Sequence, residues 1–229
     1  MESRTKPRIS VAKLGEYMHA PAGRRERILR DQKFPSAVKV NPYERARSSI
    51  RSVLLADGDV VARLSSVVGE LERRSPKSPY DAESIQLSVS AIRQFCAQYT
   101  LLDFRGATAV SALTPQTHIV VEGVAISVTP SVALRRIGRS GREEWGALIL
   151  AIRKGCSLDD RAGVAIGELL RLSLEANGYV TIAPSLCIVA DVFSKRSFTA
   201  TGRGQRVRQD VESACREISA RWPTLLAAA

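Results

Sequence analysis

Apolar and polar residues alternate with the period of an α-helix through the first hundred residues of the chain. The clearest run follows Asp59, where Val60, Leu64, Val68 and Leu71 fall on one helical face. This pattern predicts five helices, each opened by a capping residue or a proline. The expected helices begin at Ser10, Pro21, Asn41, Asp59 and either Asp81 or Ser84.

The period then changes from 3.6 residues to 2, which indicates strands. Residues 119–121 lead into Glu122-Gly123, a hairpin signal, and the alternation resumes through residues 124–134 with a pause at Pro130. The basic turn 137–144 returns the chain into a strand at Trp145–Ile152 that is apolar enough to be central. Three meandering strands are therefore expected.

The last part of the chain returns to helix and strand in alternation. Asp159-Asp160 offers an N-cap for a helix that ends at Asn177-Gly178. A buried strand at Leu186–Phe193, a return strand at 195–200 and a terminal helix at Gln205–Trp222 follow. The predicted class is α+β with an α/β-type core. We expect a basic helical region at 1–104 and a core of mixed sheet, helix, strand pair and C-terminal helix at 105–229.

The charge of the chain indicates which class of partner to expect. The 229 residues include 34 Lys and Arg against 23 Asp and Glu, which gives a net charge of +11 and a field that favours polyanions. Residues 1–51 alone carry 13 basic and 5 acidic side chains. Arginine forks onto phosphate oxygens, so nucleic acid, with DNA favoured, is the expected partner. The expected phosphate contacts are Arg24, Arg25, Arg27 and Arg30 in the second helix and Arg135, Arg136, Arg139 and Arg142 in the hairpin.

The order of elements after residue 105 resembles the PD-(D/E)xK nuclease superfamily: helix, three meandering strands, helix, strand pair and helix. In that superfamily an aspartate often follows a proline on the second strand, and the third strand carries an acid, a spacer and a lysine. The carboxylates hold a divalent cation that polarises the phosphate and generates hydroxide. The resemblance implies a nuclease-like core.

The signature residues are absent from the matching positions. Pro130 is followed by Ser131 where the aspartate would stand, and the acid and lysine positions hold Ala147 and Ile149. The resemblance is therefore one of layout, and it implies a core whose catalytic site has degenerated.

A rearranged site is the alternative that keeps catalysis. Glu122, Glu144 and Lys154 would be its catalytic residues, with Glu143 or the helix residue Glu168 as further acids. Mg²⁺ or Mn²⁺ would be required only in this case, and no cofactor is expected otherwise. The competing interpretation is that these acids belong to a surface hairpin, a turn and a solvated helix face.

Other chemistries are poorly supported. Cys96, Cys156, Cys187 and Cys215 are widely spaced, and only two histidines occur, so neither a disulfide framework nor a zinc site is indicated. The first residues, MESRTKPR, lack the apolar run that a signal peptide would show, and no uninterrupted apolar run reaches membrane length. We expect a cytoplasmic protein without a membrane partner.

Three hypotheses follow. The first is a nucleic-acid-binding protein with a degenerate nuclease-like core, acting as an accessory subunit in DNA repair, defence or a mobile element. The second is a divalent-metal-dependent nuclease with a rearranged site. The third is an interaction protein that binds another chain through an apolar face of its N-terminal helices, with the positive charge incidental.

Overall fold

The computed structural model describes residues 3–35, 41–111, 118–155, 157–202 and 204–227. Cys156 lies outside them. The helices are α1 (Val11–His19), α2 (Ala22–Lys33), α3 (Glu44–Leu54), α4 (Val60–Arg73), α5 (Pro79–Tyr99), α6 (Asp160–Ala176) and α7 (Gln205–Arg221). The strands are β1 (Arg8–Ser10), β2 (Thr108–Val110), β3 (His118–Val121), β4 (Val124–Ser127), β5 (Val132–Ile137), β6 (Glu143–Ala151), β7 (Ile182–Asp191) and β8 (Arg196–Thr199).

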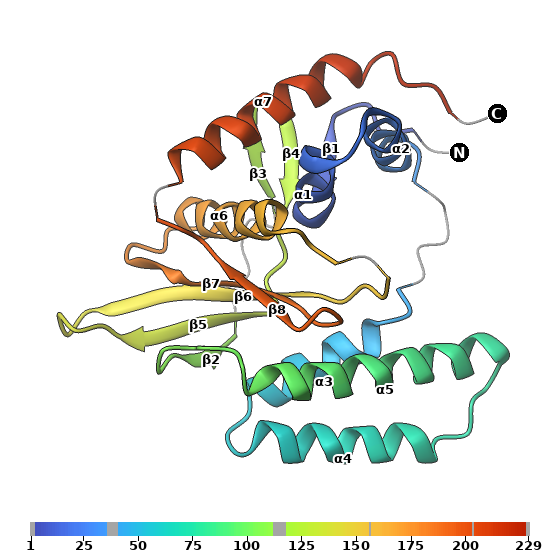
Figure 1. Cartoon of the computed structure of the whole chain (residues 1–229), viewed down its shortest axis with the longest axis vertical. Coiled ribbons are helices and arrows are strands. Elements are labelled where there is room, and N and C mark those ends of the chain that lie inside the picture. Colours follow the sequence, from blue (N-terminus) through green and yellow to red (C-terminus); the bar gives the residue numbers. More distant parts are fainter. Residues whose placement is uncertain (1–2, 36–40, 112–117, 156, 203, 228–229) are drawn as a thin grey trace.

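The expected α+β class is confirmed, with helices first and a helix last. A five-stranded sheet in the order β2-β5-β6-β7-β8 forms the central layer. Helices α3, α4 and α5 lie on one face, and α6 lies on the other (Figure 1). β6 and β7 are parallel because α6 crosses between them, and the remaining neighbours are antiparallel.

β6 is buried on both faces, as its apolar run predicts. Ala147 and Ile149 pack into the core formed with α1, α2, α6 and α7. Leu148 and Leu150 point the other way, into the core formed with α3, α4 and α5. Alternate residues of one strand thus hold two hydrophobic cores together.

A second, three-stranded sheet has the order β1-β4-β3. The hairpin expected at Glu122-Gly123 joins β3 to β4, and both turn residues have positive φ. The expected meander differs in one respect. At Pro130 the chain does not merely pause, because β4 pairs in the small sheet and β5 pairs in the large one.

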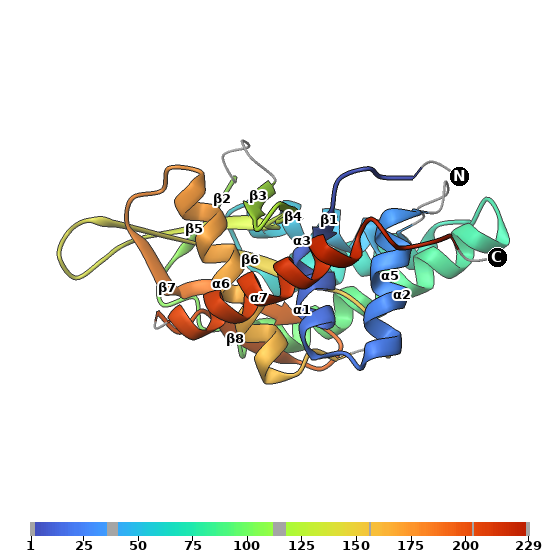
Figure 2. The same cartoon turned by 90° about the horizontal axis from the view of Figure 1, so that it is seen from above.

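The remaining layers stack beyond α6. The small sheet, α1 and α2 lie over it, and α7 runs diagonally across the top of the molecule (Figure 2). The turn between β5 and β6 projects from the body in both views. Among the described residues, no helix is both long enough and apolar enough to cross a bilayer.

Most helix starts fall where they were expected. The side chains of Ser10, Asp59 and Asp159 each accept a backbone N–H in the first turn of their helix. Helices α3 and α5 are exceptions, because α3 begins at Glu44, after the expected Asn41, and α5 begins before Asp81. Ser78 is the cap of α5 and Pro79 is its first residue, a position that favours proline because its N–H has no helical partner.

Candidate anion-binding site

The arginines of α2 that were expected to bind phosphate are largely occupied within the fold. The Arg24 side chain donates from Nε to the Glu16 carboxylate at 2.8 Å. Arg25 reaches Glu217 on α7 at 3.1 Å and also donates to the carbonyls of Met18 and Ala20. These contacts join α2 to α1 and α7, so both arginines have a structural role.

Only one of the four predicted α2 arginines lacks an acidic partner. Arg30 pairs with Glu26 one turn earlier, at 2.7 Å. Arg27 is exposed and forms no ion pair among the described residues. The helix therefore presents less uncompensated charge than its sequence suggests.

The β5–β6 hairpin divides in the same way into a neutral stem and a charged tip. Arg135 lies 3.4 Å from Glu143, and Arg136 lies 2.6 Å from Glu144 across the two strands. Opposite charges paired across strands stabilise the stem and cancel its charge.

Arg139 and Arg142 occupy the exposed turn of this hairpin. Neither forms an ion pair among the residues that the structure describes. The projecting tip is thus the part of the hairpin that keeps the charge expected from the sequence.

The residues proposed for a rearranged nuclease site lie apart. Glu144 stands at the start of β6 and Lys154 just beyond its end, and a nine-residue strand is about 30 Å long. Glu122, in the β3–β4 turn, lies 3.7 Å from Arg216 of α7. The structure therefore does not bring Glu122, Glu144 and Lys154 to one point.

The other candidate acids do not complete a metal site. Glu143 belongs to the hairpin stem, and Glu168 is buried in α6, where it pairs with Arg171 at 2.8 Å and accepts the Thr201 N–H at 3.1 Å. Within the described ranges, no three His, Cys, Asp or Glu side chains come together as metal ligands would.

A cavity of about 540 Å³ opens beside Pro130, where the resemblance places the nuclease signature. One wall is the polar face of α3, and the other is the link between β4 and β5. Its polar side chains are two arginines, four hydroxyls and one acid rather than a group of carboxylates. They include Arg47, Ser48, Arg51, Ser52, Thr129 and Ser131.

Arg47 is the central side chain of this cavity. Its Nη1 donates to the carbonyl oxygen of Leu150 at 2.8 Å, at the end of β6. Burial lowers the pKa of Arg47, the Glu44 carboxylate opposes that shift, and the Arg153 guanidinium adds to it. Among the described residues Arg47 forms no ion pair, so its charge is offset by the Leu150 carbonyl dipole and, at longer range, by the Glu44 carboxylate.

Ser131 is the residue that stands where the resemblance would place an aspartate. Its backbone N–H donates to the Leu148 carbonyl at 2.7 Å, and its hydroxyl accepts the Leu150 N–H at 3.3 Å. The residue is thus anchored to β6. A single hydroxyl is a poor substitute for a carboxylate as a ligand of Mg²⁺.

Arg153 extends the positive charge toward α1. It lies 3.3 Å from Glu16, which also binds Lys13 at 2.8 Å and Arg24. One buried nitrogen of Arg153, Nη2, has no hydrogen-bond partner in the described chain. The Glu16 carboxylate thus pairs with three cations. We call a different set, Arg47, Arg51 and Arg153, the arginine cluster.

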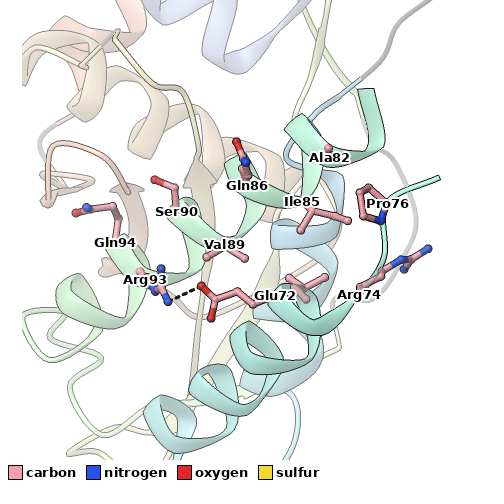
Figure 3. A pocket seen from close by; sticks show the side chains of 11 residues that line it. Glu72, Arg74, Pro76, Ala82, Ile85, Gln86, Val89, Ser90, Arg93 and Gln94 are labelled. Atoms are coloured by element: carbon pink, nitrogen blue, oxygen red, sulfur yellow. Dashed lines mark hydrogen bonds and ion pairs between the residues drawn. The ribbon is translucent and has the colours of Figure 1, made fainter. Parts of the chain in front are cut away.

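A second cavity, of about 550 Å³, lies between α4 and α5. Its lining includes Ile85 and Val89, and Arg93 pairs there with Glu72 at 2.7 Å (Figure 3). That pair joins the two helices across the groove. Arg74 also lines this cavity, and it forms no ion pair among the described residues.

Comparison with protein-family models, with curated proteins and with solved structures finds no match for this chain. The arginine cluster was not predicted from the sequence, although α3 carries a usable signal. Arg47 and Arg51 are four residues apart on one helical face, opposite the buried Ala46, Ile50 and Val53. What the sequence could not show is that this face meets the end of β6.

Proposed function

We propose that this protein binds nucleic acid, with DNA as the favoured form, through phosphate contacts centred on the arginine cluster. The observation that carries the proposal is Arg47, a half-buried guanidinium that lines an open cavity and forms no ion pair among the described residues. The Glu44 carboxylate offsets its charge only at a distance, and a phosphate oxygen would supply a direct charged partner.

The surroundings support the same partner. Arg51 lies one turn beyond Arg47, and the hydroxyls around them can donate to phosphate oxygens. The net charge of +11 attracts polyanions from a distance. Arg27, Arg139 and Arg142 are exposed and would add weaker contacts at the surface. A cytoplasmic location remains part of this proposal.

The core of the proposed binder has the layout of a PD-(D/E)xK nuclease without its catalytic acids. Ser131, Ala147 and Ile149 occupy the signature positions, and the last two are packed in the core. An accessory role in DNA repair, defence or a mobile element follows by analogy only. The metal-dependent nuclease and the interaction protein remain as alternatives.

The test is a fluorescence anisotropy titration with single-stranded and duplex DNA and RNA at two salt concentrations. Wild type is compared with Arg47→Gln and Arg51→Gln. Arg74→Gln is the matched control, because Arg74, like Arg51, is exposed and forms no ion pair among the described residues. Each cluster variant should weaken binding about tenfold and reduce the salt slope by about 1, while the control changes neither.

Parallel reactions with Mg²⁺ or Mn²⁺ separate the alternatives. Cleavage that is lost in Glu144→Ala or Lys154→Ala would establish the rearranged nuclease. Absence of nucleic-acid binding at low salt, together with salt-insensitive binding of a protein partner, would favour the interaction protein. Equal weakening by Arg74→Gln would show that only the overall charge matters and would remove the arginine cluster from the proposal.

A further inference from the structure

The cavity beside Pro130, which Arg47 and Arg51 line, is called the arginine cavity. Its shape restricts which phosphate can enter it. The space is a pocket between α3 and residues 129–131, and its volume of about 540 Å³ lies within the range of small-ligand sites. The backbone of a continuous duplex has a sugar on both sides of every phosphate, and it contacts a protein along its surface. A pocket of this form suits a phosphate that is esterified to a sugar on one side only.

Two arginines line the pocket beside one carboxylate, Glu44, and it is the arginine side of the pocket that favours a dianion. A phosphate monoester carries about −1.5 to −2 charges at pH 7, whereas a diester within a strand carries one. Arg47 and Arg51 are spaced at i and i+4 on α3, so both guanidinium groups can reach one ligand. Two cations and the hydroxyls of Ser48 and Ser131 offer more donors than a single diester needs.

Glu44 gives the pocket a second chemical character. It lines the same wall one turn before Arg47, and its carboxylate accepts from the Asn41 side-chain amide at 3.1 Å. A carboxylate repels phosphate, but it accepts hydrogen bonds from sugar hydroxyls and from base amino groups. Leu55 and Pro130 provide apolar contact beside it. The lining therefore matches a nucleoside attached to the phosphate.

We infer that the arginine cavity binds the phosphomonoester of a nucleotide, with Arg47 and Arg51 on the phosphate and Glu44 on the nucleoside. The nucleotide is either the phosphorylated end of a strand or a free mononucleotide, which share this chemistry. The inference rests on the proposed function for its site. It goes further in naming the phosphate that the site selects.

The first arm of the test uses one single-stranded oligonucleotide in three forms: with a 5′-phosphate, with a 3′-phosphate and with hydroxyls at both ends. A phosphorylated end should bind at least tenfold more tightly than the hydroxyl form. That difference should disappear in Arg51→Gln and persist in Arg74→Gln. Equal binding of all three forms, still salt-dependent, would overturn this inference and leave the proposed function standing.

The second arm uses free ligands and the thermal unfolding midpoint. Adenosine monophosphate should raise the midpoint of wild type more than inorganic phosphate does at equal concentration, and adenosine should not raise it. Stabilisation by the monophosphate without binding of any oligonucleotide would support the phosphomonoester site and overturn nucleic-acid binding. No effect of any probe in either arm would overturn both.

Glu44→Gln is the variant that separates the two halves of the pocket. Removal of a nearby negative charge should strengthen binding of inorganic phosphate, while the preference for the nucleoside monophosphate over phosphate should fall at least threefold. An unchanged preference would show that Glu44 does not contact the nucleoside and would reduce the inference to a phosphate site. Folding of each variant is checked by the cooperativity of thermal unfolding in buffer alone.

Discussion

The guanidinium of Arg47 donates to the carbonyl oxygen of Leu150 across 2.8 Å, which fastens α3 to the end of the central strand β6. The contact uses one edge of the guanidinium, and the side chain also lines the open cavity. Replacement of Arg47 should therefore affect the stability of the fold differently if its role is purely structural than if it binds a ligand.

Arg47→Met should lower the free energy of unfolding by only about 1 kcal/mol. The variant loses one charge-assisted hydrogen bond, worth about 1.5–3 kcal/mol, and regains much of the penalty of burying a cation. Chemical denaturation with wild type alongside measures the difference. A loss above about 3 kcal/mol would indicate that Arg47 is retained for stability. A residue retained for binding, in contrast, commonly reduces the stability of the fold.

Glu16→Gln should strengthen nucleic-acid binding, although it removes contacts from the fold. Glu16 is shared by Lys13, Arg24 and Arg153, so its neutralisation adds one net positive charge beside the arginine cluster. We expect roughly threefold tighter binding at low salt and a steeper salt dependence, measured by anisotropy.

Glu217→Gln is the control for this prediction. Glu217 also pairs with two arginines, Arg25 and Arg221, but it lies on α7. The same change of charge there should leave the affinity unchanged. Equal strengthening in both variants would mean that binding follows net charge and not position.

Asp81→Asn should reduce stability at neutral pH and have little effect in acid. A hydrogen bond from the Lys77 N–H is the main cause that lowers the pKa of Asp81, burial opposes it, and Arg45 at 2.5 Å adds to the lowering. Because the folded-state pKa is depressed, this carboxylate stabilises the fold above its ordinary pKa of 3.8. The stabilisation is lost as the pH falls through the lowered value.

Urea midpoints at pH 7 and in strong acid measure the effect. The variant should unfold earlier than wild type at pH 7, and the two curves should converge in acid. A constant difference between the curves at every pH would show that the Asp81 charge is not what stabilises the contact between α3 and α5.

Gly163→Ala should destabilise the protein by about 1–3 kcal/mol. A Cβ at this position of α6 would stand 2.2 Å from the ring of Phe198 on β8, which cannot move away because it is packed in the core. Gly69→Ala on α4 is the matched control, since nothing lies within 4 Å of its added Cβ. That change should stabilise by up to about 1 kcal/mol. Thermal unfolding of both variants checks the prediction.

Cys187 and Cys215 should resist alkylation in the native protein, and Cys96 should react before them. Burial raises the pKa of each of the first two thiols to about 12, which leaves roughly one part in ten thousand as thiolate at pH 8. Burial also raises the pKa of Cys96, but that residue is only half-buried. Peptide mass mapping after timed exposure to iodoacetamide gives the order. Early modification of Cys187 would show that α6 and β7 separate readily.

Local signals explain the part of the fold that the sequence predicted. Capping by Ser10, Asp59 and Asp159 depends on residues within one turn, so it can be recognised without knowledge of the fold. The start of α5 was placed too late because Ser78 and Pro79 also suit a loop. A serine followed by a proline at the first helical position is the signal that was available.

The parts that escaped prediction depend on partners far along the chain. Nothing near Pro130 indicates that the strands before and after it belong to different sheets. Arg24 and Arg136 are predicted to contact phosphate, but the sequence does not show which acids pair with them. The role of Arg47 is hidden for the same reason, because its contact with the Leu150 carbonyl exists only where α3 meets β6.

The pairing of β1 with β4 has a consequence for synthesis on the ribosome. Arg8–Ser10 is made well before its parallel partner, which runs from Ala125 to Ser127. Helices α3, α4 and α5 can form from local contacts in the meantime, whereas a parallel pairing over such a separation forms slowly. The first strand must therefore remain unpaired until residues 11–124 have been made, and the small sheet can close only after the intervening helices.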